Sequence, residues 1–295
     1  MPDRWLVLSV RVPSDESTGE LAEGLFALGG SAVHEDDDWL RTHLDPPADP
    51  KAFVAAAAER LRHLVGSEPE LEWRWQADED WSSQWRRGLA PRRVGRRVVV
   101  AQPWNEDEAR ALVAGVASPV LVVIDPATAF GTGEHATTRG ALRLMEGVLA
   151  GGERVLDVGT GSGILALAAA GLGADRVLAV ESDPESMGNA RANLERSPWG
   201  RRVELVNDEV DAAYLARHGV PGFDLIVANV LSGVLVPLLP GFRRAISPGG
   251  RVILGGIMES EAPLVLDATS GARLGLEAED REEGWWTGLL GRVDR

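Results

Sequence analysis

The sequence predicts two domains, a doubly wound α/β domain preceded by a smaller α+β domain. The chain has 295 residues, of which 44% are hydrophobic and 25% charged, values typical of a packed globular protein with room for more than one core. From about Val98 onward, short apolar strands alternate with helical stretches, as in a parallel sheet covered by helices on both faces. The earlier residues follow the order β-α-β-β-α-β, a split βαβ pattern.

Residues 1–76 are expected to form the smaller, ferredoxin-like domain. Its helices follow from apolar residues at helical spacing and its strands from alternating apolar residues. Gly29 and Gly30 end the first helix, and the acidic run Asp36-Asp37-Asp38 forms a turn. The expected elements are strands at residues 6–12, 31–35, 39–44 and 71–75, and helices at residues 18–28 and 50–65.

Residues 77–97 are interpreted as a linker that contains a short helix. Trp81 and Trp85 fall one helical turn apart, on one face of that helix. We interpret the two indoles as packing anchors rather than as a surface on which a ligand stacks.

Residues 98–295 are assigned to the α/β domain. Because its strands are parallel, ligands are expected at their carboxyl ends. Residues 274–279 and 285–293 are strand-like with Gly284 between them, so they predict an antiparallel hairpin that closes the sheet. The remaining strand candidates are residues 155–158, 177–180, 203–206, 225–228 and 252–254.

Composition limits the possible environment and partners. The chain contains no cysteine, which excludes disulfides, thiolate catalysis and zinc sites built on sulfur. The N-terminus lacks the pattern of a signal peptide, and no apolar run approaches the roughly 20 residues of a membrane helix, so a soluble cytoplasmic protein is expected. A net charge of −15 disfavours nucleic acid and favours basic partners.

The strongest local signal is a glycine turn between a strand and a helix. Gly159, Gly161 and Gly163 follow the strand in the spacing G-x-G-x-G, which lets the backbone approach a ligand closely. Nicotinamide dinucleotide and S-adenosylmethionine are both candidates. The nicotinamide fingerprint is G-x-G-x-x-G, however, and the acidic Asp157 would repel a pyrophosphate but suit a methionine amine. Glu181, at the end of the next strand, can accept both hydroxyls of a ribose in either cofactor.

Two further segments supply polar or aromatic groups near the same sheet edge. Asn229 ends an apolar strand, and its neutral amide can accept hydrogen bonds from an amine. In the segment before the glycine turn, Phe130 is a candidate for lining the cofactor pocket, and Thr137 or Thr138 is expected to cap the following helix. His135 is either a general base or a structural residue.

These motifs together resemble the ribosomal protein L-eleven methyltransferase family. The resemblance spans nearly the whole chain and is strongest at residues 129–138, the glycine turn, residues 229–231 and the linker. It implies a Rossmann-like seven-stranded methyltransferase domain that binds S-adenosylmethionine and an N-terminal domain that recognises a large-subunit ribosomal protein. It also implies N-methylation of lysine side chains or of the N-terminal α-amine of that protein. Carried over motif by motif, the cofactor contacts fall on Thr138, Gly159, Glu181 and Asn229, to which our own analysis adds Asp157, Gly161 and Phe130, with Asn229 as the catalytic residue.

Three positions depart from the family pattern, and each keeps the chemical groups the site needs. Ala136 replaces the usual proline, Glu181 replaces an aspartate, and residues 126–128 lack a glycine. Alternatives remain open at this point: a methyltransferase for another protein amine, an amide or a nucleobase, a nicotinamide-dependent oxidoreductase, or a non-catalytic binding module.

Overall fold

The chain divides into two compact units, Met1–Leu89 and Ala90–Arg295, and each is described by itself. The computed structural model describes residues 4–12, 18–30, 33–36, 38–65, 69–77, 89–125 and 131–293. Trp81, Trp85 and Phe130 lie outside these residues. Within the described ranges, no helix has both the length and the apolar character needed to cross a bilayer.

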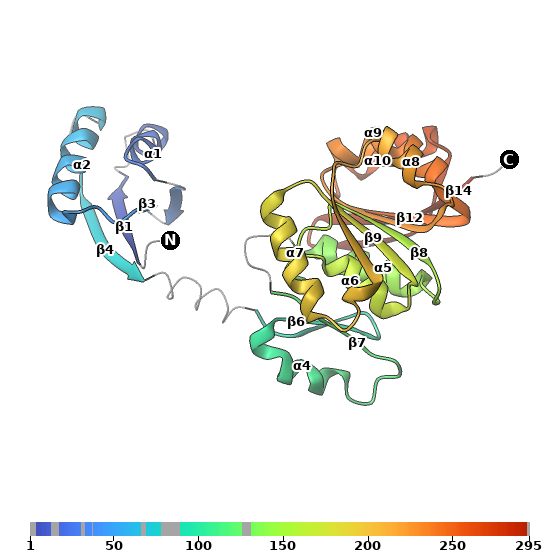
Figure 1. Ribbon diagram of the computed structural model, residues 1–295. Helices are drawn as coiled ribbons and strands as arrows, with labels where there is room; N and C mark the ends of the chain where they lie inside the picture. The colour runs from blue at the N-terminus through green and yellow to red at the C-terminus, as the bar shows by residue number, and fades with distance from the viewer. Residues whose placement is uncertain are drawn as a thin grey trace. The chain divides into compact units, whose positions relative to one another are not determined.

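The first unit is a four-stranded antiparallel sheet packed against two helices (Figure 1). Its strand order, β2-β3-β1-β4, is the order that the predicted ferredoxin-like pattern requires. Leu6 and Leu8 of β1 pack with Leu21 and Leu25 of α1 and with Leu61 of α2 in one buried cluster. The elements are β1 (Arg4–Arg11), α1 (Thr18–Ala27), β2 (Val33–Asp36), β3 (Trp39–Leu44), α2 (Pro50–Val65) and β4 (Leu71–Ala77).

The second unit contains the predicted seven-stranded sheet, in the order β10-β9-β8-β11-β12-β14-β13. The first five strands pair in parallel, and β14 pairs antiparallel with both β12 and β13, so the closing hairpin is confirmed. Gly284 occupies the hairpin turn with φ 76°. The strands are β8 (Arg154–Val158), β9 (Arg176–Glu181), β10 (Val203–Asn207), β11 (Phe223–Asn229), β12 (Ile246–Met258), β13 (Leu274–Glu282) and β14 (Trp285–Arg292).

Helices cover both faces of this sheet, and successive strand residues face opposite cores (Figure 1). Val155 of β8 belongs to the core beneath α5, α6 and α7, whereas Leu156 belongs to the core beneath α8, α9 and α10. The strands are therefore apolar on both sides, as expected for a buried parallel sheet. The helices are α5 (Ala136–Val148), α6 (Ile164–Leu172), α7 (Pro184–Arg196), α8 (Ala212–His218), α9 (Ser232–Ala245) and α10 (Ala262–Gly271).

A small three-stranded sheet, which the sequence analysis does not predict, precedes the main fold. Strand β6 pairs antiparallel with β5 and parallel with β7, and valines of all three strands join the core beneath α5 and α6. These strands have only three or four residues, too few for an alternating pattern to be read. The elements are β5 (Arg92–Val94), β6 (Val98–Ala101), η1 (Pro103–Asn105), α4 (Glu106–Val113) and β7 (Val120–Val123); a further single turn, η2 (Gly200–Arg202), precedes β10.

Candidate active site

A cavity of about 580 Å³ lies at the carboxyl ends of β8, β9 and β11. The strand order reverses between β8 and β11, which is where ligands bind in open α/β sheets. Its polar lining includes three carboxylates but, within the described part of the chain, no lysine or arginine. The lining residues are Gly131, His135, Thr137, Thr138, Val158, Gly159, Thr160, Gly161, Ile164, Leu165, Val180, Glu181, Ser182, Ser186, Asp208, Glu209, Val210, Asn229, Val230, Leu231, Val234, Leu238, Gly256 and Trp285.

The glycine turn forms the floor of this cavity. Gly159 and Gly161 have φ values of 66° and 56°, in the left-handed region that side chains disfavour. The backbone N–H groups of Gly159 and Thr160 donate to the Val180 carbonyl at 2.9 and 3.0 Å, which ties the turn to β9. A Cβ atom at Gly159 would lie 2.7 Å from Cγ1 of Val230. The turn therefore excludes a side chain at this position on both conformational and steric grounds.

Asp157 lies beneath the turn and is not among the residues that line the cavity. Its side chain is fully buried, and its Oδ2 accepts a 2.6 Å hydrogen bond from the Thr160 hydroxyl. Its Oδ1 has no hydrogen-bond partner among the residues that the structure describes. Burial raises the pKa of this carboxyl to about 7. The structure thus places Asp157 as a support for the turn, and its contact with a ligand stays a prediction.

Glu181 lines the cavity and braces the turn from its other side. Its Oε2 accepts from the Gly161 N–H at 2.9 Å. Its Oε1 accepts from the backbone of Ser182 and Asp183 at 2.9 and 3.0 Å. Asp183 caps α7, as expected, by accepting from the N–H groups of Glu185 and Ser186. Each carboxylate oxygen has two lone pairs, so the three bonds leave one on Oε2, and Glu181 can still accept from a ribose hydroxyl while it holds the turn.

Asn229 and Thr138 meet at the other end of the cavity. The Asn229 Nδ2 atom donates to the Thr138 hydroxyl at 3.4 Å, a long contact, and Thr138 is fully buried. The Asn229 Oδ1 atom is buried and has no hydrogen-bond partner within the described ranges. A buried acceptor without a donor costs about 1–3 kcal/mol. The amide oxygen lies against Gly255 of β12, where an added Cβ atom would come within 2.7 Å of it, so the Asn229 side chain must turn before this oxygen meets a donor in the cavity.

His135, rather than a threonine, caps the helix that carries Thr138. Its Nδ1 atom accepts from the backbone N–H of Thr137 at 3.4 Å and lies 2.8 Å from the Thr137 hydroxyl. The expectation that Thr137 or Thr138 caps α5 is therefore wrong, because α5 begins at Ala136 and both threonines lie inside its first turn. Burial, followed by the charge of Arg139, lowers the pKa of His135, which favours a neutral ring at pH 7.

Trp285, at the start of β14, is a cavity residue that the sequence analysis did not single out. Its ring centroid lies 4.6 Å from that of His135, at an interplanar angle of 67°. The two residues are 150 positions apart in the sequence. No local pattern marks Trp285, so only the pairing of β14 with β12 brings it to the site.

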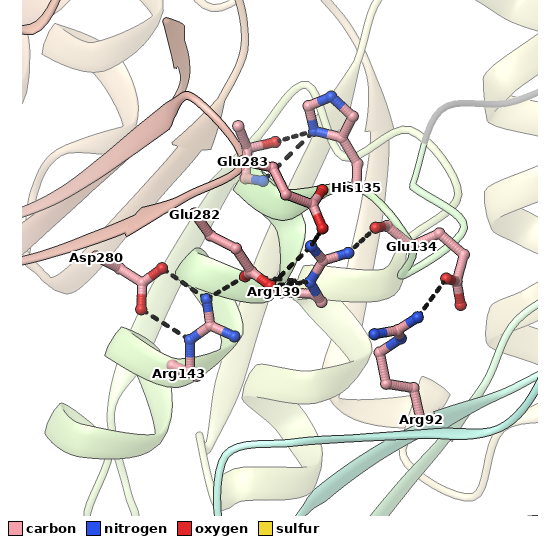
Figure 2. A network of polar contacts seen from close by, with 9 residues as sticks. Arg92, Glu134, His135, Arg139, Arg143, Asp280, Glu282 and Glu283 are labelled. Atoms are coloured by element: carbon pink, nitrogen blue, oxygen red, sulfur yellow. Dashed lines mark hydrogen bonds and ion pairs between the residues drawn. The ribbon is translucent and has the colours of Figure 1, made fainter. Parts of the chain in front are cut away.

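A network of ion pairs holds the hairpin that carries Trp285 against α5 (Figure 2). At its centre is Arg139, only 3% exposed, whose Nη2 atom lies 2.9 Å from carboxylate oxygens of both Glu282 and Glu283. Arg139 also donates to the backbone carbonyl of Glu134, next to the capping His135. One guanidinium thus joins the helix, the loop before it and the hairpin turn.

Neighbouring pairs extend this network in two directions (Figure 2). Arg143, one turn along α5, contacts Asp280 and Glu282 at 2.6 Å. On the other side, Arg92 of β5 pairs with Glu134 at 3.0 Å. Hydrogen bonding by the arginines lowers the pKa of Glu282, so these pairs remain charged near pH 7. The same described residues contain no group of three or more His, Asp or Glu side chains arranged to hold a metal ion.

Comparison with known proteins assigns the chain to a family. The sequence profile of ribosomal protein L11 methyltransferase (PrmA) matches residues 30–292. The chain belongs to the ribosomal protein L11 methyltransferase family. Family membership makes it an enzyme, an S-adenosylmethionine-dependent methyltransferase, and confirms the resemblance seen in its motifs.

Individual relatives cover most of the chain. The ribosomal protein L11 methyltransferase of Chloroflexus aurantiacus is 35% identical, over 98% of this chain and 98% of its own length. That of Pelotomaculum thermopropionicum is 38% identical over 84% of this chain and 77% of its own length. A crystal structure of ribosomal protein L11 methylase from Lactobacillus delbrueckii subsp. bulgaricus has a TM-score of 0.57 at 30% identity, covering 70% of this chain and 100% of that one.

Proposed function

We propose that this enzyme transfers methyl groups to amino nitrogens of ribosomal protein L11, on lysine side chains, the N-terminal α-amine or both. The observation that carries the proposal is the cavity itself. Its three carboxylates stand without a lysine or arginine in the described lining, and Asn229, whose amide oxygen has no donor among the described residues, lines the same space. Such a lining suits cationic ligands, and both a sulfonium cofactor and a substrate amine are cations.

The residues of the cavity fit S-adenosylmethionine. We assign the open backbone at Gly159 and Gly161 to its methionine part and the carboxylate of Glu181 to its ribose hydroxyls. Thr138 and Asn229 border the same space. When bound, the cofactor supplies an electrophilic methyl group on a sulfonium. A dinucleotide fits less well, because its pyrophosphate would meet carboxylates and no cation.

Protonation is the main obstacle to amine methylation. A lysine amine with a pKa near 10.4 costs about 4.6 kcal/mol to deprotonate at pH 7, whereas an α-amine costs about 1. His135 is the one imidazole among the described lining residues, and its Nδ1 atom is already engaged by Thr137. We therefore propose that the proton leaves to solvent and that the dry end of the cavity accepts the neutral amine. The Asn229 oxygen then accepts an N–H bond and orients the nitrogen lone pair.

An amide or a nucleobase amino group is the second candidate substrate. Enzymes for planar substrates typically follow the asparagine with two prolines and an aromatic residue on which the substrate stacks. Here Val230-Leu231-Ser232 follows Asn229. The sequence thus lacks that stacking surface at this position, which favours an aliphatic amine.

We propose that the first unit recognises the ribosomal protein, with residues 1–76 as the recognition domain. Of the expected linker, residues 77–97, those from Ala90 onward belong to the second unit, where Arg92–Val94 form β5. The first unit contributes no residue to the described lining of the cavity. Its acidic turn includes Asp38, whose side chain is 72% exposed and lies 3.8 Å from Arg11. Ribosomal proteins are basic and would be attracted to such a surface. The cytoplasm, where these proteins are made, is the expected place of action.

A methylation assay with purified ribosomal protein L11 tests the proposal. The chain is incubated with labelled S-adenosylmethionine and that protein, and a proteolytic digest is analysed by mass spectrometry for methylated lysine, α-amine and glutamine. Asn229→Ala should reduce kcat by roughly 100-fold, a larger loss than any in cofactor affinity, since the orientation of the amine is lost. Asn189→Ala, which removes an amide that bonds the Asp125 carbonyl outside the cavity, is the matched control. Label on glutamine alone would instead establish an amide as the substrate group.

A further inference from the structure

Two exposed apolar side chains line the cavity, and two more lie on segments that are bonded to its lining. Leu231 and Val234, at the start of α9, are 71% and 51% exposed. Met258, at the end of β12, and Leu264, in the first turn of α10, are 52% and 66% exposed. We name these four residues the apolar rim. They are four of the ten exposed large hydrophobic residues in the described part of the chain, so the remaining six are spread over all other surfaces.

Hydrogen bonds hold the two halves of the apolar rim together. Glu261 accepts from the Ser232 hydroxyl at 2.9 Å and from the Met258 N–H at 3.2 Å, which joins the start of α9 to the turn before α10. Leu231 and Val234 line the cavity directly. Met258 is the ladder partner of Trp285, which lines the cavity from its other side. The apolar rim therefore borders the opening through which an amine would reach Asn229.

The charges around the apolar rim select its occupant. Glu259 and Glu283, with side chains 48% and 67% exposed, are paired with Arg281 and Arg139, and the cavity lining adds the exposed Asp208 and Glu209. A membrane with anionic headgroups would be repelled by these acids, and a second copy of a chain with net charge −15 would present acids of its own. A basic protein segment with an apolar side chain matches both the acids and the apolar surface.

We propose that the apolar rim is the docking surface for the extended, basic segment of the protein substrate that carries the target amine. The inference rests on the proposed function and adds to it a second contact, on the catalytic unit itself. An apolar side chain of the segment packs on the apolar rim, and its flanking cations face the carboxylates. Leu231 follows Asn229 by two residues and both line the cavity, so a segment held there lies close to Asn229.

A double variant, Met258→Ser with Leu264→Ser, tests the docking surface. Neither residue lines the cofactor cavity, and both are already exposed, so the fold has little to lose. The KM for ribosomal protein L11 should rise about tenfold, while kcat and the Kd of S-adenosylmethionine stay unchanged. Val220→Ser is the matched control, because Val220 is 81% exposed but precedes the amino end of β11, opposite Asn229. The control should keep the wild-type KM.

Other results would overturn the docking surface without touching the proposed function. If the wild-type chain methylates the ribosomal protein but the double variant keeps its KM, or if Val220→Ser raises KM equally, the apolar rim is not the docking surface. Sedimentation that shows wild-type dimers broken by the double variant would assign the surface to a second copy. Absence of transfer by the wild-type chain would instead reject the proposed function. A wild-type KM that rises with salt supports the basic segment, and a salt-independent KM opposes it.

Discussion

Replacing Asp157 by asparagine changes the charge beneath the glycine turn while leaving its shape in place. The carboxyl is fully buried, and an amide oxygen can still accept the 2.6 Å hydrogen bond from the Thr160 hydroxyl. Asparagine stays neutral at every pH, whereas the buried aspartate must ionise as the pH rises. The variant should therefore differ from the wild type most clearly in how its free energy of unfolding depends on pH.

The size of that difference follows from the two pKa values. The carboxyl titrates near 3.8 in the unfolded chain and, because of burial, near 7 in the folded one. The folded state binds the proton more tightly, so the group stabilises the fold below pH 3.8 and loses that contribution as the pH rises through 7. At about 1.4 kcal/mol for each pH unit between the two pKa values, the loss is about 4 kcal/mol. Asp157→Asn should remove this loss.

Urea unfolding at several pH values between 4 and 8 measures the effect. The difference in unfolding free energy, variant minus wild type, should grow more positive across this range, and a constant offset from the new amide does not alter that trend. Asp183→Asn is the control, since Asp183 is exposed and the Ser186 hydroxyl lowers its pKa. Its carboxylate contributes stability that is lost as the pH falls. Parallel pH profiles for Asp157→Asn and the wild type would refute the buried, proton-binding carboxyl.

Four further predictions concern the site and the first unit. Gly159→Ala should lower cofactor affinity, measured by calorimetry, and reduce the free energy of unfolding by about 1–2 kcal/mol. The reasons are the left-handed backbone and the 2.7 Å approach of the new Cβ atom to Val230. Unchanged affinity would show that the turn does not bind the cofactor. Glu181→Ala should weaken cofactor binding by about 1.5–3 kcal/mol, and Glu181→Asp should restore most of it if the acid holds the ribose. Arg139→Met should raise KM and lower kcat because the contacts with the hairpin are lost, and Arg139→Lys should restore part of the activity. If Arg139→Met lowers only the melting temperature, Arg139 stabilises the fold without shaping the site. A chain that begins at Asp78 should bind S-adenosylmethionine normally but lose most activity on the ribosomal protein, and full activity in this chain would exclude recognition by the first unit.

Local sequence patterns were sufficient to predict the main elements of both units. The five central strands, the closing hairpin and the helices of the first unit all carry apolar periodicity within their own residues. The glycine turn is also predictable from local sequence. Three glycines between a strand and a helix indicate backbone with positive φ, which other residues disfavour. Asp183 before Pro184 likewise predicts the N-cap of α7.

Capping of α5 shows where local patterns mislead. Threonine is a common N-cap residue, so Thr137 and Thr138 were the natural choice, but the helix begins earlier, at Ala136, and the ring of His135 takes that role. Asp157 was expected to face a ligand because it precedes the turn. In the structure its side chain is buried and accepts from the Thr160 hydroxyl, and contact with a ligand stays a prediction.

The sequence by itself therefore determined the fold, the glycine turn and the family, because each depends on residues that are close together along the chain. The shape of the active site was decided by tertiary structure. Trp285 reaches His135 only because β14 pairs with β12, and Arg139 holds that hairpin through partners more than 140 residues away. The Asn229 Oδ1 atom has no hydrogen-bond donor among the described residues, and this too follows from which distant side chains pack around it. Such contacts arise from the packing of distant segments, and no short stretch of sequence encodes them.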